Sequence, residues 1–124
     1  MLGTGVTRVG DQEIGRTGLG EASAASAGFD AVIATIETTT AAGYMPSARP
    51  MVVKMLAERH TGRLLGVQSV GGPGSAKRVD VAAAAIAGGL TVEDLVGLDL
   101  SYAPPLSTLW DPLQTAARTL LSRL

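Results

Sequence analysis

The sequence predicts an α+β domain, in which an antiparallel sheet is flanked by helices. Two observations support this class. Segments rich in β-branched residues are joined by short turns, which favours strands that pair with their neighbours in the chain. Helical patterns stand before and after these segments, as expected for an α+β fold. The 124 residues are typical of one domain, so we expect a single domain over residues 1–124.

The first part of the chain is predicted to contain short strands, one helix and one longer strand. The short strand candidates are Val6–Val9 and Glu13–Arg16. Residues 21–27 are rich in alanine and serine and predict a short helix. Residues 31–40 are rich in β-branched side chains and predict a strand. Residues 41–46, which end in a proline, predict the loop that follows it.

Residues 51–58 and 63–70 predict a β-hairpin. Their connection, residues 59–62, has four residues with glycine in the last place, which is ordinary for a hairpin loop. Lys54 interrupts an otherwise apolar strand. We expect it at an edge or on the outer face of the sheet, where its ammonium group reaches water. A partner in another subunit is the alternative for Lys54.

Two helices are predicted after the glycine-rich turn of residues 71–75. The first has one apolar face at helical spacing. This face comprises Val79, Ala82, Ala83, Ile86 and Leu90. Gly88 and Gly89 end this helix, and Thr91 with Asp94 resembles the capping box of a second, short one.

The last segment carries the strongest helix pattern. Asp111 is a good N-cap, Pro112 suits the first helical position, and Gln114 stands at the third. An apolar stripe follows at helical spacing, with Arg118 and Arg123 opposite. The stripe comprises Leu113, Ala116, Ala117, Leu120, Leu121 and Leu124.

Composition excludes several classes of function. A formal net charge of −1 argues against nucleic-acid binding and against a membrane-surface role. The longest apolar run, Val81–Ala87, is far shorter than the ~20 residues of a membrane span. The absence of cysteine excludes disulfides and thiol catalysis, and it fits a cytoplasmic protein. Hydrophobic residues make up 46% of the chain, so we expect a second subunit or domain to cover some of them.

The segment Asp99–Pro112 is the most informative one for function. Pro104 and Pro105 impose an extended course and remove two backbone donors, which predicts a stiff loop that presents Tyr102 and Trp110. Stiff loops with aromatic side chains usually contact a ligand or a partner. Tyr44 is also closely followed by a proline, and the phenol of either tyrosine can donate a proton or a hydrogen bond. The equally weighted alternative is that both rings only fill core or interface space.

Three weaker motifs have plainer interpretations. His60 is the single histidine, and its place in the hairpin connection predicts an exposed turn residue. The turn of residues 71–78 leads into a helix and could bind phosphate, but it departs from the P-loop pattern, so a solvated helix start is favoured. Gly3 and Gly5 begin a dinucleotide fingerprint, but Arg8 stands where its third glycine belongs.

Taken in order, several of these segments resemble the C-terminal dimerisation domain of the FAD-dependent pyridine nucleotide-disulfide oxidoreductases. The resemblance covers nearly the whole chain and is closest to the coenzyme A-disulfide reductases and the related NADH oxidases, peroxidases and polysulfide reductases. It rests on Gly15–Leu19, Ala42–Pro46, Lys54, Thr61–Gly66, Arg78–Asp80, Leu98–Pro105 and Trp110–Pro112. The His-Pro motif of the glutathione-reductase branch is absent from the sequence.

The resemblance implies a role in pairing two flavoprotein subunits, and hence a homodimer. It implies that Tyr44 and Tyr102 support the partner's active site, and that Ala103 and Pro104 lie on a loop towards the partner's flavin. We expect FAD and NAD(P)H to bind other domains of the parent enzyme, so this chain holds no cofactor and is not catalytic alone. Two alternatives remain: a small enzyme that uses a tyrosine as acid with Lys54, and an anion-binding module built on the turn of residues 71–78.

Overall fold

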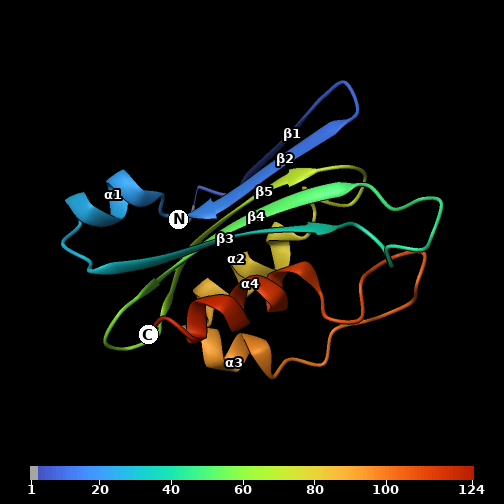
Figure 1. Ribbon diagram of the computed structural model, residues 1–124. Helices are drawn as coiled ribbons and strands as arrows, with labels where there is room; N and C mark the ends of the chain where they lie inside the picture. Colours follow the sequence, from blue (N-terminus) through green and yellow to red (C-terminus); the bar gives the residue numbers. More distant parts are fainter. Residues whose placement is uncertain (1–2) are drawn as a thin grey trace.

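The computed structural model describes residues 3–124, which form a five-stranded antiparallel sheet flanked by helices (Figure 1). The predicted α+β class is therefore confirmed. The strands are β1 (Gly5–Val9), β2 (Gln12–Gly18), β3 (Ala31–Thr39), β4 (Pro50–Glu58) and β5 (Leu64–Gly71). The helices are α1 (Glu21–Ser26), α2 (Val79–Ala87), α3 (Val92–Val96) and α4 (Pro112–Leu121).

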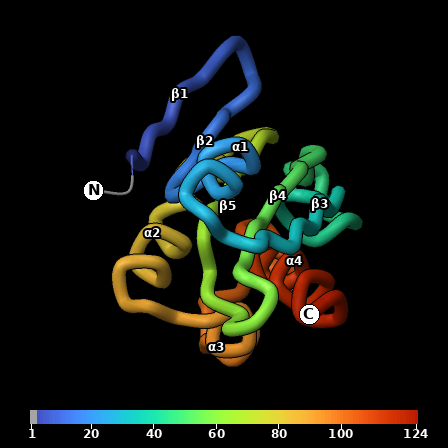
Figure 2. The backbone as a smooth tube through the Cα atoms, turned by 90° about the vertical axis from the view of Figure 1, so that its left-hand side faces the viewer, coloured from blue at the N-terminus to red at the C-terminus, as the bar shows by residue number. Residues whose placement is uncertain are grey.

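The strands follow the order β1-β2-β5-β4-β3, and every neighbouring pair is antiparallel. The predicted β4–β5 hairpin is confirmed: the Glu58 N–H donates to the Arg63 carbonyl at 2.9 Å. Gly62 has a φ of 71°, a left-handed conformation that favours glycine. Figure 2 shows the β1–β2 hairpin projecting from the sheet, away from α3 and α4.

Lys54 does not lie at a sheet edge, because β4 is an inner strand between β5 and β3. The predicted edge position is wrong, whereas the outer-face position is confirmed. The Lys54 ammonium group lies 2.6 Å from the carboxylate of Glu21, at the start of α1. Its ionic partner therefore belongs to the same chain. The next outward residue of β4, Leu56, is buried with Ala24 of α1.

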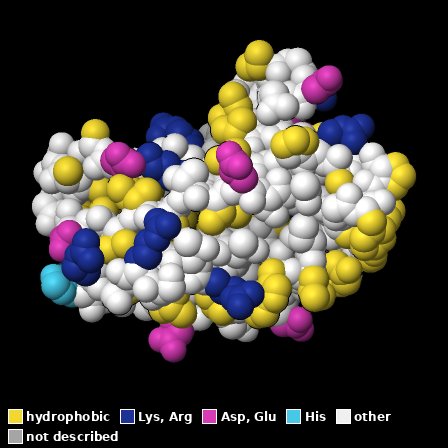
Figure 3. All heavy atoms as spheres, in the orientation of Figure 1, with side chains coloured by type: hydrophobic (Ala, Val, Ile, Leu, Met, Phe, Trp, Pro, Cys, Tyr) yellow, Lys and Arg dark blue, Asp and Glu magenta, His cyan; other side chains and the backbone are white. Residues whose placement is uncertain are grey.

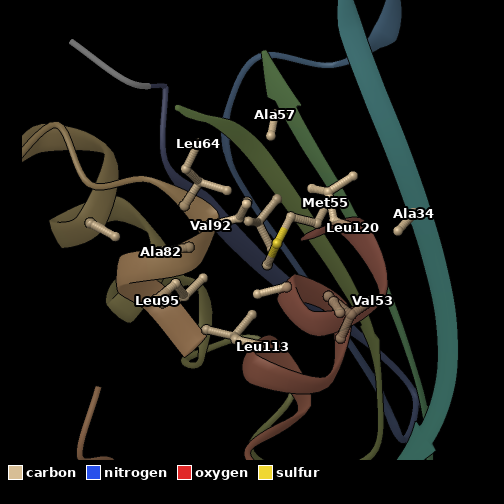
Figure 4. Packing of buried hydrophobic residues seen from close by; sticks show 14 of the residues in the cluster. Ala34, Val53, Met55, Ala57, Leu64, Ala82, Val92, Leu95, Leu113 and Leu120 are labelled. Carbon is tan, nitrogen blue, oxygen red and sulfur yellow. The ribbon is translucent and has the colours of Figure 1, made fainter. Parts of the chain in front are cut away.

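The main core lies between the other face of the sheet and helices α2, α3 and α4 (Figure 4). Met55 and Val53 of β4 point into it and are fully buried, as are Leu95 of α3 and Leu120 of α4. Burying each such side chain contributes about 1.5–3 kcal/mol to stability. This core therefore fixes α4, and with it the segment that leads into α4, against the sheet.

Helix α4 begins as predicted but uses its residues differently from the sequence-based expectation. The Asp111 carboxylate accepts a 2.9 Å hydrogen bond from the Leu113 N–H, which confirms the N-cap. Gln114 does not contribute to this cap. Its amide donates instead to the Leu98 carbonyl at 2.7 Å, which ties α4 to the residues after α3. Leu121 and Leu124 are exposed, so the predicted stripe is too wide by these two residues.

Helices α2 and α3 follow the predicted pattern with one shift. On α2, which packs against β5 and β2, the structure buries Ala85 in place of Ala83. The predicted Leu90 lies beyond the end of this helix and is half-buried. The capping box of α3 is confirmed: the Thr91 N–H donates to the Asp94 carboxylate at 2.9 Å. The Asp94 N–H in turn donates to the Thr91 hydroxyl at 3.2 Å.

Candidate functional site

Two irregular segments lie side by side at one end of the sheet, on the right in Figure 1. They are residues 40–49, between β3 and β4, and residues 98–111, between α3 and α4; together we call them the loop end. One backbone hydrogen bond joins the two segments, from the Ala42 N–H to the Pro104 carbonyl at 2.9 Å. The fold therefore brings together two loops that are far apart in the sequence.

The two tyrosines singled out in the sequence both lie at the loop end. Tyr44 is 77% exposed and Tyr102 is 45% exposed. Within residues 3–124, neither phenolic hydroxyl has a hydrogen-bond partner. A tyrosine that only filled the core of this chain would be buried. The alternative in which the rings fill the core of this chain is therefore excluded. The alternative in which they fill an interface with another subunit or domain is not.

Ala103 and Pro104 are half-buried, and their carbonyl groups are used within the chain. The Ala103 carbonyl accepts from the N–H groups of Leu106 at 2.9 Å and of Ser107 at 3.0 Å, which makes a turn that contains both prolines. The predicted extended course at Pro104 and Pro105 is therefore wrong, because the fixed φ of proline also suits a turn. The Pro104 carbonyl accepts from Ala42. The loop backbone is thus held by internal hydrogen bonds, so its side chains keep defined positions.

Large apolar side chains gather at the loop end besides the tyrosines. Leu106, Leu109 and Trp110 are exposed, and the Trp110 ring has the Arg118 guanidinium 4.5 Å from its centre. Figure 3 shows hydrophobic side chains along the right-hand edge of the molecule, over the loop end. A surface with several exposed large apolar residues is typical of a protein–protein contact.

Arg78, just before α2, connects both loops. Its Nη2 donates to the Leu106 carbonyl at 3.0 Å and to the Thr40 carbonyl at 3.5 Å. Its Nε lies 3.4 Å from the Asp111 carboxylate, and the two side chains of this ion pair are each only 13% exposed. Its Nη1 donates to the Gly74 carbonyl at 3.5 Å. All three guanidinium nitrogens are therefore engaged within the chain.

A surface hollow of about 350 Å³ lies beside this guanidinium group. Tyr102 and Ser101 line one side of it, and Val81 of α2 lines another. Tyr102 and Arg78 therefore line the same hollow.

The turn of residues 71–78 is not an open anion site. Its Gly74 and Ala76 N–H groups donate to one carboxylate oxygen of Glu13 on β2, at 3.1 and 3.2 Å. Arg78 is also occupied, as described above. A bound phosphate would have to displace a carboxylate of this chain, so the structure does not support the anion-binding alternative.

The small-enzyme alternative is not supported either. Lys54 binds Glu21 at the start of α1, and α1 lies at the end of the sheet opposite the loop end in Figure 1. The Lys54 ammonium group is therefore directed to a different element from those that carry Tyr44 and Tyr102. His60 is exposed in the β4–β5 connection, as predicted, 3.9 Å from the Asp30 carboxylate. Within residues 3–124, no group of three or more potential metal ligands is present. None of the helices in this range is long and apolar enough to span a membrane.

Sequence reasoning missed the role of Arg78 and the contribution of Leu106 and Leu109 to the exposed apolar surface. One usable signal was Asp111, because an N-cap needs a single carboxylate oxygen and leaves the other free to bind a cation. The sequence does not indicate which of its ten arginines and lysines this cation is.

Comparisons with known proteins agree with this architecture. The family model described as "Pyridine nucleotide-disulphide oxidoreductase, dimerisation domain" matches residues 6–112. The chain is 44% identical over 120 residues to the NAD(P)H sulfur oxidoreductase (CoA-dependent) of Pyrococcus furiosus, covering 97% of the chain and 27% of that protein. It is 36% identical over 124 residues to an NADH oxidase of Methanocaldococcus jannaschii, covering all of the chain and 28% of that protein.

A solved structure has the same fold. The NAD-dependent persulfide reductase from A. fulgidus superposes with a TM-score of 0.94 at 34% identity, over 98% of this chain and 23% of that one. The chain thus spans about a quarter of the length of the proteins that it matches.

Proposed function

Because this chain belongs to the dimerisation-domain family of the pyridine nucleotide-disulphide oxidoreductases, we propose that it pairs two subunits of an FAD- and NAD(P)H-dependent oxidoreductase. In this proposal residues 1–124 are one dimerisation domain, and its loop end completes the active site of the partner subunit. The observation that carries the proposal is the loop end itself: exposed aromatic side chains on a backbone held by hydrogen bonds within the chain.

The proposed site roles follow from what the loop end exposes. The hydroxyl groups of Tyr44 and Tyr102 are free within the described chain, so each can donate a hydrogen bond to a thiolate or a substrate bound by the partner subunit. Ala103 and Pro104 face the partner's flavin in this arrangement. Leu106, Leu109 and Trp110 supply apolar area for the contact between subunits.

We propose that residues 3–124 hold neither FAD nor a nicotinamide nucleotide. The glycine-rich turn before α2 is filled by Glu13, whereas a dinucleotide site needs free N–H groups at that place. We therefore propose that both cofactors bind other domains of the parent enzyme. The proposed homodimer is cytoplasmic and binds neither nucleic acid nor membrane, which the net charge of −1 and the lack of cysteine support.

Two measurements test this function. Light scattering of the 124-residue chain is expected to show a dimer at tens of micromolar, roughly the affinity range of a weak standard interface. The second uses a chimera, in which this chain replaces the C-terminal domain of the Pyrococcus furiosus relative. The chimera is expected to be dimeric and to turn over its substrate. A monomeric chain, or a dimeric chimera that binds flavin without turnover, would contradict the proposal.

Tyr102→Phe in the chimera separates chemistry from packing, because it removes only the hydroxyl group. Turnover is expected to fall roughly tenfold to hundredfold while the dimer survives, which corresponds to the loss of one hydrogen bond to a charged group. Unchanged turnover in Tyr102→Phe, together with loss of the dimer in Tyr102→Ala, would mean that Tyr102 serves only as packing.

A further inference from the structure

The Arg78 side chain contacts both segments of the loop end and the residue that caps α4. Its closest acceptor is the Leu106 carbonyl at 3.0 Å, in the same turn that begins at Ala103. Its ion pair with Asp111 is largely shielded from solvent. Asp111 is itself immobilised, because its other carboxylate oxygen caps α4. A chain of contacts therefore runs from the core helix through Asp111 and Arg78 to the loop.

The loop depends on such an anchor. Residues 98–111 contain no helix or strand, and ordering the backbone of each residue costs about 1–2 kcal/mol in conformational entropy. Its exposed side chains, Leu106 and Leu109 among them, contribute little burial to offset that cost. The only backbone hydrogen bond within residues 3–124 from this segment to residues 40–49 is the one between Ala42 and Pro104.

We propose that Arg78 is a positioning residue: its guanidinium group holds the loop of Tyr102 in the geometry in which the tyrosine meets the partner subunit. The inference rests on the proposed function, because it assigns the tyrosine its role there. It adds a residue from a different element, outside both loops, on which that role depends.

The guanidinium shape matters as well as the charge. A planar group with five N–H donors can reach carbonyl groups and a carboxylate in different directions at once, and here it faces Leu106, Thr40 and Asp111. A lysine ammonium is a compact point charge whose donors all lie on one nitrogen, so it cannot reach acceptors in three separate directions in the same way. Arg78→Lys is therefore expected to keep the attraction to Asp111 and to lose the hydrogen bonds to the Leu106 and Thr40 carbonyls.

Hydrogen exchange in the 124-residue chain tests the anchor without any flavin or partner domain. The reporter is the Ala42 amide, whose acceptor lies in the loop, and Val53 in β4 reports on the core. In Arg78→Met and Arg78→Lys, Ala42 is expected to exchange roughly tenfold to hundredfold faster, with Val53 unchanged. Arg59→Met is the matched control, since among residues 3–124 the Arg59 side chain binds only Asp30, at the opposite end of the sheet.

Two outcomes would overturn the anchor, and a third would overturn the role of the guanidinium shape. Unchanged exchange at Ala42 in Arg78→Met would show that the loop holds itself. Equal acceleration at Ala42 and Val53 would show that Arg78 supports the whole fold rather than the loop. If the Ala42 amide exchanged at the same rate in Arg78→Lys as in the unsubstituted chain, positive charge alone would be enough to hold the loop. The guanidinium shape would then have no role.

A double-substitution cycle in the chimera tests the link to Tyr102. Arg78→Met is expected to lower kcat at least tenfold, and Arg78→Met combined with Tyr102→Phe is expected to be no slower than the slower single variant. Multiplicative losses would overturn the link, because a merely structural role of Arg78 acts independently of the hydroxyl group. Faster exchange at Ala42 with normal turnover in both single variants would refute the proposed function and leave the anchor intact.

Discussion

The helix-covered face of the sheet buries its large side chains completely, whereas the loop end leaves its large side chains exposed. In the core, Met55, Leu95 and Leu120 have no exposed surface. At the loop end, Tyr44 and Leu106 are mostly exposed, and the backbone is held by a few hydrogen bonds and one shielded ion pair. Stability and recognition therefore reside in different parts of this domain, so substitutions should separate them.

The largest expected effect on stability is in the core. Leu120→Ala removes a fully buried side chain that packs α4 on the sheet, so we expect the free energy of unfolding to fall by about 2–5 kcal/mol. Leu121→Ala, one residue further along the same helix but exposed, is the control and should change it by less than about 0.5 kcal/mol. Urea unfolding measures both. Similar losses in the two variants would contradict the observed orientation of α4.

Asp111 belongs to both regions, because one oxygen caps α4 and the other binds Arg78. Asp111→Ala removes both interactions and is expected to cost about 2–3 kcal/mol of unfolding free energy. Asp111→Asn retains a capping oxygen but no charge, so it should cost less while still loosening the loop. Urea unfolding combined with exchange at the Ala42 amide separates the two effects. Equal stability losses in both variants would mean that the cap contributes nothing.

Two glycines, one in the sheet and one at the loop end, differ in the space around them. A Cβ at Gly66 of β5 would stand 1.9 Å from the Leu19 carbonyl oxygen, so Gly66→Ala forces the backbone apart and is expected to cost about 1–3 kcal/mol. A Cβ at Gly43 of the loop end would meet nothing within 4 Å, so Gly43→Ala should stay within about 0.5 kcal/mol. Thermal unfolding of both variants checks this. A tolerant Gly66 would show that the chain at Leu19 moves freely.

The smallest expected effect on folding is at Tyr102. Tyr102→Ala should change the free energy of unfolding by less than about 0.5 kcal/mol, because nearly half of its side chain is exposed in the single chain. The dissociation constant of the dimer should nevertheless rise by roughly tenfold or more, since the ring's apolar area is lost from the contact. Sedimentation equilibrium measures association, and urea unfolding measures stability. A variant that folds less well yet associates normally would reverse the assignment of the two regions.

The α+β class, the β4–β5 hairpin and the start of α4 could be predicted from the sequence. These features depend on residues close in the chain: alternation and β-branching select strands, Gly62 permits the turn, and Asp111 with Pro112 begins the helix. The resemblance of ordered segments to a family added the dimerisation role. The stripe of α4 was predicted too wide at Leu121, because helical spacing does not tell where the neighbouring sheet ends.

The contacts that hold the loop end join segments far apart in the chain, so they could not be predicted from the sequence. Arg78 lies 28 residues from Leu106, 33 from Asp111 and 38 from Thr40, and no local pattern relates them. The same holds for Glu13, which lies 61 residues from Gly74 and fills the turn that the sequence left open to an anion. Strand order placed Lys54 inside the sheet rather than at its edge. Such contacts arise because packing the core brings distant segments together, and polar side chains then bind whichever partners the fold places within reach.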